Sequence, residues 1–236
     1  MCPGLARFWT AENFMAHMYH LPPTVTILLI GAATTLAVSI IGNALGLIVA
    51  IAICVMRLSL NRAMRLAGAA YVSFFRGVPL LVQLLIVYYF LPTIGFDLPP
   101  FFAAVIGLGL CTAAYQAENL RGGFLIIPRG QAEAARAFGY TRGQTLRRIL
   151  IPQALRAAAP ALINEMILIL KASSLVSVVG VADLTREAQN IVARDLQPIK
   201  WYLFAALIYL VINLILARLG VSIEKRLNVG YGATAI

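Results

Sequence analysis

Four ionisable side chains lie within, or at the ends of, long apolar segments of the sequence: Arg76, Glu118, Glu165 and Lys171. Placing a charged group in hydrocarbon costs about 3 kcal/mol or more, so such residues are functional candidates by default. Their chemistry is that of charge, because a carboxylate binds cations whereas a guanidinium or an ammonium binds anions. Two neighbouring polar residues give a weaker signal of the same kind, Asn164 and Tyr115.

Three of the four also have a purely structural interpretation. Glu118 and Arg121 stand three residues apart, where they would form an ion pair at the end of a helix. Arg76 would lie at the membrane surface, and Lys171 is long enough to extend its ammonium towards water. Glu165 and Lys171 are about 120° apart around one helix, so they would not pair with each other.

The sequence contains no catalytic set and no metal-binding set. It has no His within an apolar segment, no H-E-x-x-H motif and no two Asp residues at membrane depth, which argues against an intramembrane protease. Cys54 and Cys111 lack metal-ligand spacing, and we predict that they pack in the core. A phosphate-binding G-x-x-x-x-G-K-[ST] loop is also absent. We therefore expect no catalysis, metal or cofactor on this chain.

The elements that must position these residues are membrane-spanning helices. The 236 residues are 61% hydrophobic and 12% charged, with a mean hydropathy of +0.87, which argues against a disordered chain and an ordinary soluble enzyme. About 20 apolar residues cross a bilayer as a helix. We predict one all-α, polytopic membrane domain over residues 1–236, with five transmembrane spans at about residues 24–56, 77–96, 98–120, 157–182 and 201–218. The first span is too long for the bilayer and must tilt or project into water.

The distribution of charge predicts the orientation of these spans. The first and third loops and the C-terminal segment carry 13 basic and 2 acidic residues, whereas the N-terminal segment and the second and fourth loops carry 4 basic and 5 acidic residues. The positive-inside rule then places the N-terminus outside and the C-terminus in the cytoplasm. Because this asymmetry accounts for the net charge of +10, nucleic-acid binding is not needed to explain it.

The third loop, at about residues 121–156, is ordered by its own pattern. Residues 131–138 are rich in Ala and predict a helix, and Gly139 stands where a left-handed glycine would end it. Thr141 would cap a second short helix that stops before Pro152. Two short helices joined at a glycine would form a compact projection on the cytoplasmic face, which a soluble partner could bind.

This loop resembles the cytoplasmic EAA loop of the permease subunits of bacterial ABC importers. The matching residues are Glu133, Ala134, Ala135, Gly139, Ile149 and Pro152, and the only departure is Ile151 in place of Leu. Residues 75–83, 114–123 and 174–184 resemble segments typical of the polar amino acid subfamily, which serves histidine, glutamine, arginine and opines. Ala172 stands where many members have Asp.

The resemblance implies the type I ABC importer permease fold in the bacterial inner membrane. It also implies that the chain is half of a translocation pathway, paired with a second permease subunit that is identical or homologous. Two ATPase subunits, which carry ATP and Mg²⁺, would bind the EAA loop, and a periplasmic or lipid-anchored protein would deliver an amino acid. The structural alternative for Glu133 is an ion pair with Arg136.

An amino acid carries an ammonium and a carboxylate, so its pathway needs both an anion and a cation. Glu165 or Glu118 would meet the ammonium, and Lys171 or Arg76 the carboxylate. A self-contained secondary transporter is the alternative function. Such carriers commonly show internal repeats, and we see none in this sequence.

Overall fold

The computed structural model describes residues 23–228, so the predicted N-terminal segment with Arg7 and Glu12 lies outside it. The regular elements in this range are all helical, as predicted. In chain order they are α2 (Pro23–Leu58), α3 (Arg62–Gly77), α4 (Leu80–Thr93), α5 (Pro100–Leu125), α6 (Arg129–Ala137), α7 (Arg142–Thr145), the π-helix η1 (Leu146–Leu150), α8 (Ile151–Ala172), the 3₁₀-helix η2 (Ser173–Val179), α9 (Leu184–Asp195) and α10 (Pro198–Asn228).

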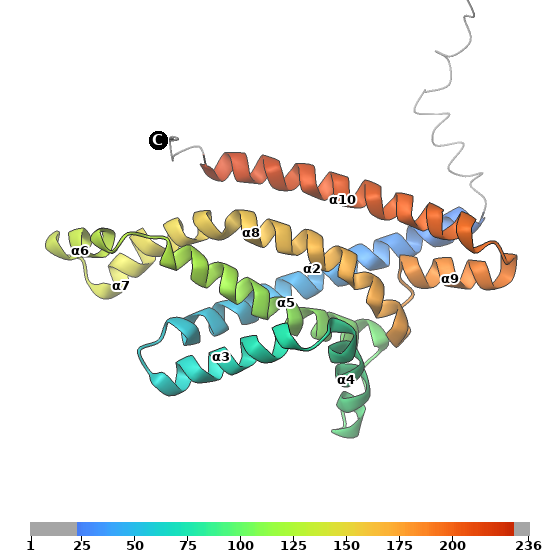
Figure 1. The fold of residues 1–236 in the computed structure, drawn as a ribbon, viewed down its shortest axis with the longest axis horizontal. Helices are drawn as coiled ribbons and strands as arrows, with labels where there is room; N and C mark the ends of the chain where they lie inside the picture. The colour runs from blue at the N-terminus through green and yellow to red at the C-terminus, as the bar shows by residue number, and fades with distance from the viewer. Residues whose placement is uncertain (1–22, 229–236) are drawn as a thin grey trace, which may run out of the picture.

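The long helices run lengthwise beside one another, and the short helices mark the two ends of the molecule. Figure 1 shows α2, α3, α5, α8 and α10 along the long axis and α4 across it. Helices α6 and α7 lie at one end and α9 lies at the other. The start of α2 is at the α9 end, and the end of α10 is at the α6 end.

Four helical segments are long and apolar enough to cross a membrane, and the α3–α4 pair makes a fifth candidate. Three of the predicted spans, at 24–56, 98–120 and 201–218, correspond to α2, α5 and α10. With 36 residues, α2 is about 54 Å long, so it overshoots the hydrocarbon core as predicted. Helix α10 has 31 residues and is longer than the predicted span.

The predicted span at 77–96 is only partly correct, because the helix in it, α4, has 14 residues and is too short to cross a bilayer alone. It is preceded by α3, and the chain bends by 107° between the two helices. The break has a local cause, since Val78 precedes Pro79 and is extended, with φ −92° and ψ 134°. The Gln83 side chain stabilises the bend by donating to the carbonyls of Phe75 and Val78 at 2.9 and 2.7 Å. The sequence prediction missed α3 because its Arg residues interrupt the apolar run.

The predicted end of a helix before Pro152 is also wrong. A helical segment runs from Arg142 to Val179, so the predicted span at 157–182 begins inside it. Proline lacks an N–H and crowds the preceding turn of an α-helix. Here that turn is η1, where the Ile151 N–H bonds to the Leu146 carbonyl, one residue further back than in an α-helix. At the other end, Gly180 adopts φ 87° and ends the segment.

Close packing of α2 on α5 forms the centre of the bundle. A Cβ on Gly46 would collide with the Thr112 side chain and would lie 2.9 Å from the Gly109 carbonyl oxygen. A Cβ on Gly42 would lie 3.2 Å from the Cβ of Leu108. The two glycines therefore bring α2 and α5 together within this chain, the packing that small residues permit between membrane helices.

A buried acidic residue joins α9 to the bundle. Asp183 caps α9 by accepting from the backbone N–H groups of Thr185 and Arg186 at 3.2 and 2.9 Å. It also accepts from the Tyr209 hydroxyl of α10 at 3.3 Å. The Leu184 N–H donates to the Thr35 hydroxyl of α2 at 3.1 Å, so three helices meet here. Burial raises the pKa of the Asp183 carboxyl, and the hydrogen bonds oppose that shift.

Candidate functional site

The first candidate site is the projection formed by α6, α7 and the turn between them, which we call the coupling knob (residues 129–150). Helix α6 ends at Phe138, and Gly139 follows with φ 78°, a left-handed conformation that favours glycine. The Thr141 hydroxyl accepts from the Gln144 N–H, and the Gln144 side chain accepts from the Thr141 N–H. The predicted helix, glycine turn and Thr cap are therefore confirmed.

The knob presents only some of its predicted contact residues on the surface. Glu133 and Ala134 are exposed, whereas Ala135 is only 4% exposed and packs inside the knob. The ion pair of Glu133 with Arg136 is not formed, because the Arg136 Nε donates to the Ala132 carbonyl at 3.2 Å. The described part of the chain gives Glu133 no other ion pair, so its carboxylate is available to a partner.

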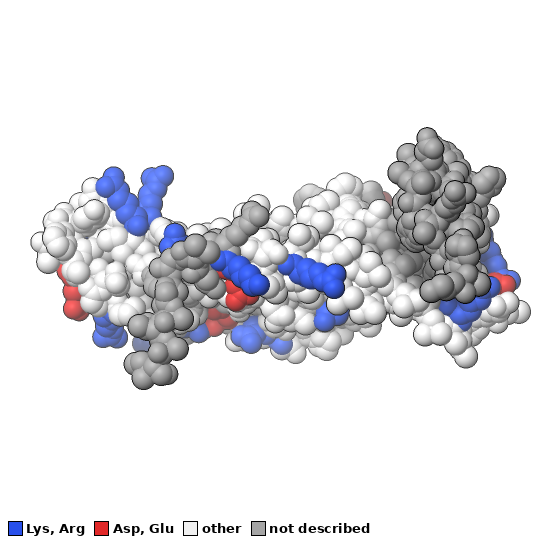
Figure 2. Space-filling model, turned by 90° about the horizontal axis from the view of Figure 1, so that it is seen from above, with Lys and Arg blue, Asp and Glu red and all other residues white. Residues whose placement is uncertain are grey.

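Two residues that the sequence pattern places at the contact are partly buried where the knob joins α8. Ile149 lies in η1 and Pro152 follows it in α8. The surface instead carries large apolar side chains that the sequence patterns did not single out, led by Phe138 at 84% exposed, with Tyr140 and Leu146. Figure 2 shows basic side chains projecting from this end of the molecule. An apolar centre with charged neighbours suits a protein partner.

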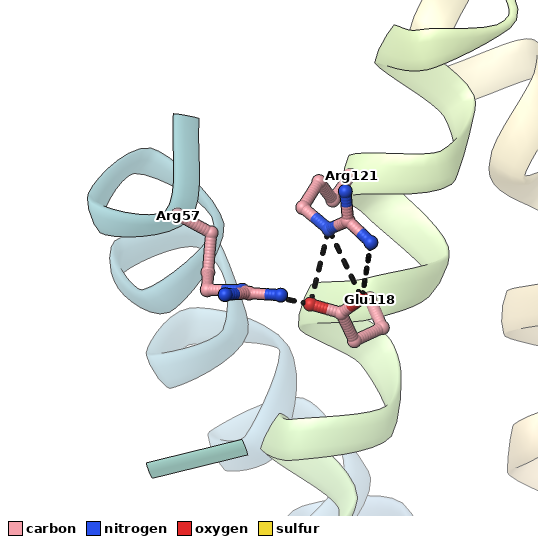
Figure 3. Close-up of polar contacts among 3 residues, drawn as sticks. All are labelled: Arg57, Glu118 and Arg121. Atoms are coloured by element: carbon pink, nitrogen blue, oxygen red, sulfur yellow. Dashed lines mark hydrogen bonds and ion pairs between the residues drawn. The ribbon is translucent and has the colours of Figure 1, made fainter. Parts of the chain in front are cut away.

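Behind the knob, an ion-pair cluster joins the ends of α2 and α5 (Figure 3). The Glu118 carboxylate accepts from the Arg57 Nε at 3.0 Å and from the Arg121 Nη2 at 2.6 Å. The predicted i, i+3 pair is thus present, and Arg57 adds a partner 61 residues away in the sequence. Because two guanidinium groups already hold Glu118, the geometry favours its structural interpretation over contact with a transported cation.

The second candidate site is a set of polar side chains on α3, α5 and α8, of which Glu165 and Thr112 are buried and Arg76 is exposed. Glu165 of α8 is 8% exposed, and its Oε1 lies 3.4 Å from the Thr112 hydroxyl of α5. The Arg76 guanidinium carbon of α3 lies 5.2 Å from the centre of the Tyr115 ring of α5, a cation–π geometry. The structure therefore places two predicted pathway residues, Arg76 and Tyr115, in contact with each other, and it pairs Glu165 with Thr112.

Two other predicted pathway residues are not in this set. Lys171 and Asn164 lie on α8 and are exposed, and the described residues offer neither of them a side-chain hydrogen bond or an ion pair. Sequence reasoning missed two further polar residues between the long helices. These are Asn43 of α2 and Gln116 of α5, whose side chains form a hydrogen bond with each other. Only the tertiary structure pairs these two residues, which are 73 positions apart.

The polar interactions described above, among residues 23–228, are hydrogen bonds and ion pairs. Within that range no three His, Cys, Asp or Glu residues lie close enough together to hold a metal ion. Cys54 and Cys111 are free thiols buried in helix packing, as predicted.

Comparisons with known proteins agree with these features. Residues 42–229 match the family described as the inner membrane component of binding-protein-dependent transport systems. The chain is 38% identical over 207 residues to the arginine transport system permease protein ArtQ of Bacillus subtilis, covering 87% of this chain and 94% of that protein. It is 34% identical to the glutamine transport system permease protein GlnP of Escherichia coli, covering 88% and 95%.

Solved structures show the same similarity. A chain from the crystal structure of an amino acid ABC transporter with histidines superposes with a TM-score of 0.80 at 35% identity, covering 92% of this chain and all of that one. A chain of the MetNI methionine ABC transporter in an inward-facing conformation gives a TM-score of 0.74 at 22% identity, covering 88% of this chain and 99% of that one, which shows a shared fold.

Proposed function

The chain belongs to the family of inner membrane components of binding-protein-dependent transport systems, and from that premise we propose how its parts carry out transport. It forms half of the pathway for an amino acid or an amino acid derivative. The coupling knob binds an ATPase subunit, and the polar set on α3, α5 and α8 lines the path. The observation that carries the proposal is the knob, since its exposed Glu133 and ordered glycine turn match a docking element at one end of a bundle of long apolar helices.

The proposed orientation follows from the knob and the charges. If the knob faces the cytoplasm, α9 and the start of α2 face the outside, and the end of α10 is cytoplasmic. This agrees with the excess of basic residues in the knob and with the near balance of charge in the loop that contains α9. The N-terminus would be outside and the C-terminus inside the cell.

The proposed assembly contains two ATPase subunits and a second permease subunit, either identical or homologous. ATP and Mg²⁺ would bind to the ATPase subunits, because this sequence has no phosphate-binding loop. A periplasmic or lipid-anchored binding protein would deliver the solute to the outer face. Closure of the ATPase pair would move the knobs as rigid bodies, and the continuous helix from Arg142 to Val179 would transmit that movement to the outer end of the pathway.

The proposed solute is an amino acid or an opine, the compounds named for relatives of this chain, which include arginine, cystine, nopaline and glutamine. Within the path, the Glu165 carboxylate would meet the ammonium of the solute and the Arg76 guanidinium its carboxylate. Each of these charged groups would form a charge-assisted hydrogen bond with the oppositely charged end of a zwitterionic solute. Selection among amino acids would rest largely with the binding protein.

The test is reconstitution of the chain with its ATPase in proteoliposomes. ATP hydrolysis and uptake are measured with and without the binding protein, using radiolabelled arginine, glutamine and cystine in turn. We expect uptake to require both ATP and the loaded binding protein. Uptake that persists without any ATPase subunit would overturn the proposal and would favour a secondary transporter.

A further inference from the structure

The turn between α9 and α10 carries a backbone conformation that its sequence does not favour. Leu196 has φ 53° and ψ 25°, and it is the only residue other than glycine with a positive φ among residues 23–228. The left-handed region places the Cβ of an L-residue too close to its own backbone, so helix ends of this kind normally use glycine. The Leu196 N–H donates to the Val192 carbonyl at 2.9 Å, a bond that glycine would form without strain.

Among residues 23–228, no hydrogen bond or buried packing of the Leu196 side chain offsets this strain. This side chain is 81% exposed, and Ile199, one turn further on, is 77% exposed. Together these two residues form an apolar point at the α9 end of the molecule, which we call the outer tip (Leu196 and Ile199). Strained backbone conformations cluster at functional sites, so a strained residue with an exposed apolar side chain is a candidate for contact with another molecule.

The base of the outer tip is held firmly, so the point is fixed in direction. The indole Nε1 of Trp201 donates to the Asp195 carboxylate at 2.5 Å. The Lys200 ammonium lies 3.8 Å from the same carboxylate and 4.6 Å from the centre of the Trp201 ring. These contacts connect Asp195, which precedes Leu196 in the sequence, with Lys200 and Trp201 in the first turn of α10. The tip is therefore preorganised, which lowers the entropic cost of binding a partner.

The charges around the tip distinguish a protein partner from the bilayer. Its neighbours include both signs, with Arg194 in the last turn of α9 and Lys200 beside Asp195. A surface that binds anionic lipid is enriched in basic residues alone. An apolar anchor surrounded by mixed charges is the arrangement of a protein interface, where a few large side chains supply most of the binding energy.

We propose that the outer tip is an anchor for the solute-binding protein, with Leu196 and Ile199 inserting into an apolar depression on that protein. This rests on the proposed function, which puts α9 outside and supplies a binding protein as partner. The charged residues around the tip then set the orientation of the docked protein.

The experiment measures ATP hydrolysis by the complete transporter in nanodiscs while the amino-acid-loaded binding protein is titrated. Leu196→Gly removes both the side chain and the strain, Leu196→Ala removes the side chain and keeps the strain, and Ile199→Ala removes the second anchor. We expect the half-saturating concentration of binding protein to rise about tenfold in each Leu196 variant. The melting temperature should be unchanged or higher in Leu196→Gly, which shows that the loss is not one of folding.

A matched control is Leu60→Ala, which removes an exposed apolar side chain from the α2–α3 turn at the opposite end of the molecule. Its half-saturating concentration should equal that of the wild type. The same wild-type value in both Leu196 variants would overturn the inference. So would a lower maximal rate at an unchanged half-saturating concentration, because it would indicate bilayer contact. A wild-type transporter that does not respond to the binding protein at all would refute the proposed function instead.

Discussion

Replacing Gly139 with Ala tests whether the shape of the coupling knob is needed for coupling. Gly139 stands between α6 and α7 with φ 78°, and a Cβ at this position would meet no atom within 4 Å. The substitution therefore adds no collision, and its cost comes from the backbone alone. An L-residue in the left-handed region costs about 1–2 kcal/mol, so the folded turn should become about 5–30-fold less populated relative to open forms.

Hydrogen exchange reports this change directly. The amides to follow are those of Phe138, Gly139 and Tyr140, which bond to the carbonyls of Ala134, Arg136 and Ala135 at 3.0–3.1 Å. We expect their exchange to accelerate by about the same factor of 5–30, while the amides of the long helices are unchanged. In proteoliposomes, the amount of solute imported per ATP hydrolysed should fall, because a loosened knob transmits the movement of the ATPase less well.

Gly143 provides the matched control. It lies in α7, within the same knob, and a Cβ added to its helical backbone would also meet no atom within 4 Å. Gly143→Ala should therefore stabilise the knob by up to about 1 kcal/mol through helix propensity and should preserve coupling. Wild-type exchange and wild-type transport in Gly139→Ala would refute the reasoning. Equal loss of coupling in both variants would show that the methyl groups block the ATPase contact and that the turn conformation is not the cause.

Three further predictions concern the packing of α2 on α5, the Glu118 ion pairs and the Asp183 cap of α9. Gly46→Ala should destabilise the packing of α2 on α5 by about 1–3 kcal/mol, measured as a lower melting temperature in detergent, whereas Gly122→Ala on α5 meets no atom and should not. Glu118→Gln should lower the free energy of unfolding by about 1–2 kcal/mol, because it leaves the guanidinium groups of Arg57 and Arg121 facing each other. A double-mutant cycle with Arg57→Ala that gives no coupling energy would refute the role of the Arg57–Glu118 ion pair. Asp183→Asn should keep the cap of α9 and change the pH dependence. Because burial raises the pKa of the wild-type carboxyl, its contribution to stability is complete below the unfolded-state pKa and is lost as the pH rises through the folded-state pKa, so the melting temperature of the wild type should fall relative to that of the Asn variant over that pH window.

Local patterns in the sequence were sufficient for most of the helical architecture. Long uncharged runs identified α2, α5 and α10, since a helix in a bilayer must satisfy its backbone internally and present apolar side chains. The knob was equally predictable, because an Ala-rich segment, a glycine and a capping Thr act over a few residues. The errors at Pro79 and Pro152 are opposite in kind. A bend at Pro79 separates α3 from α4, whereas the helix continues through Pro152, where a π-turn accommodates the ring.

The sequence by itself determined the class of the protein, since apolar run length, loop charge and the spacing of the Glu-Ala-Ala motif are all local properties of the chain. The sequence also predicted the Glu118–Arg121 pair, but only the tertiary structure decided the pairings between helices. Glu118 accepts from Arg57, which is 61 positions away, and Glu165 meets Thr112 across two helices. It also decided that Leu196 is strained and exposed. Such pairings depend on how helices rotate and pack against one another, which small residues such as Gly46 fix at the interface and which no short window of sequence contains.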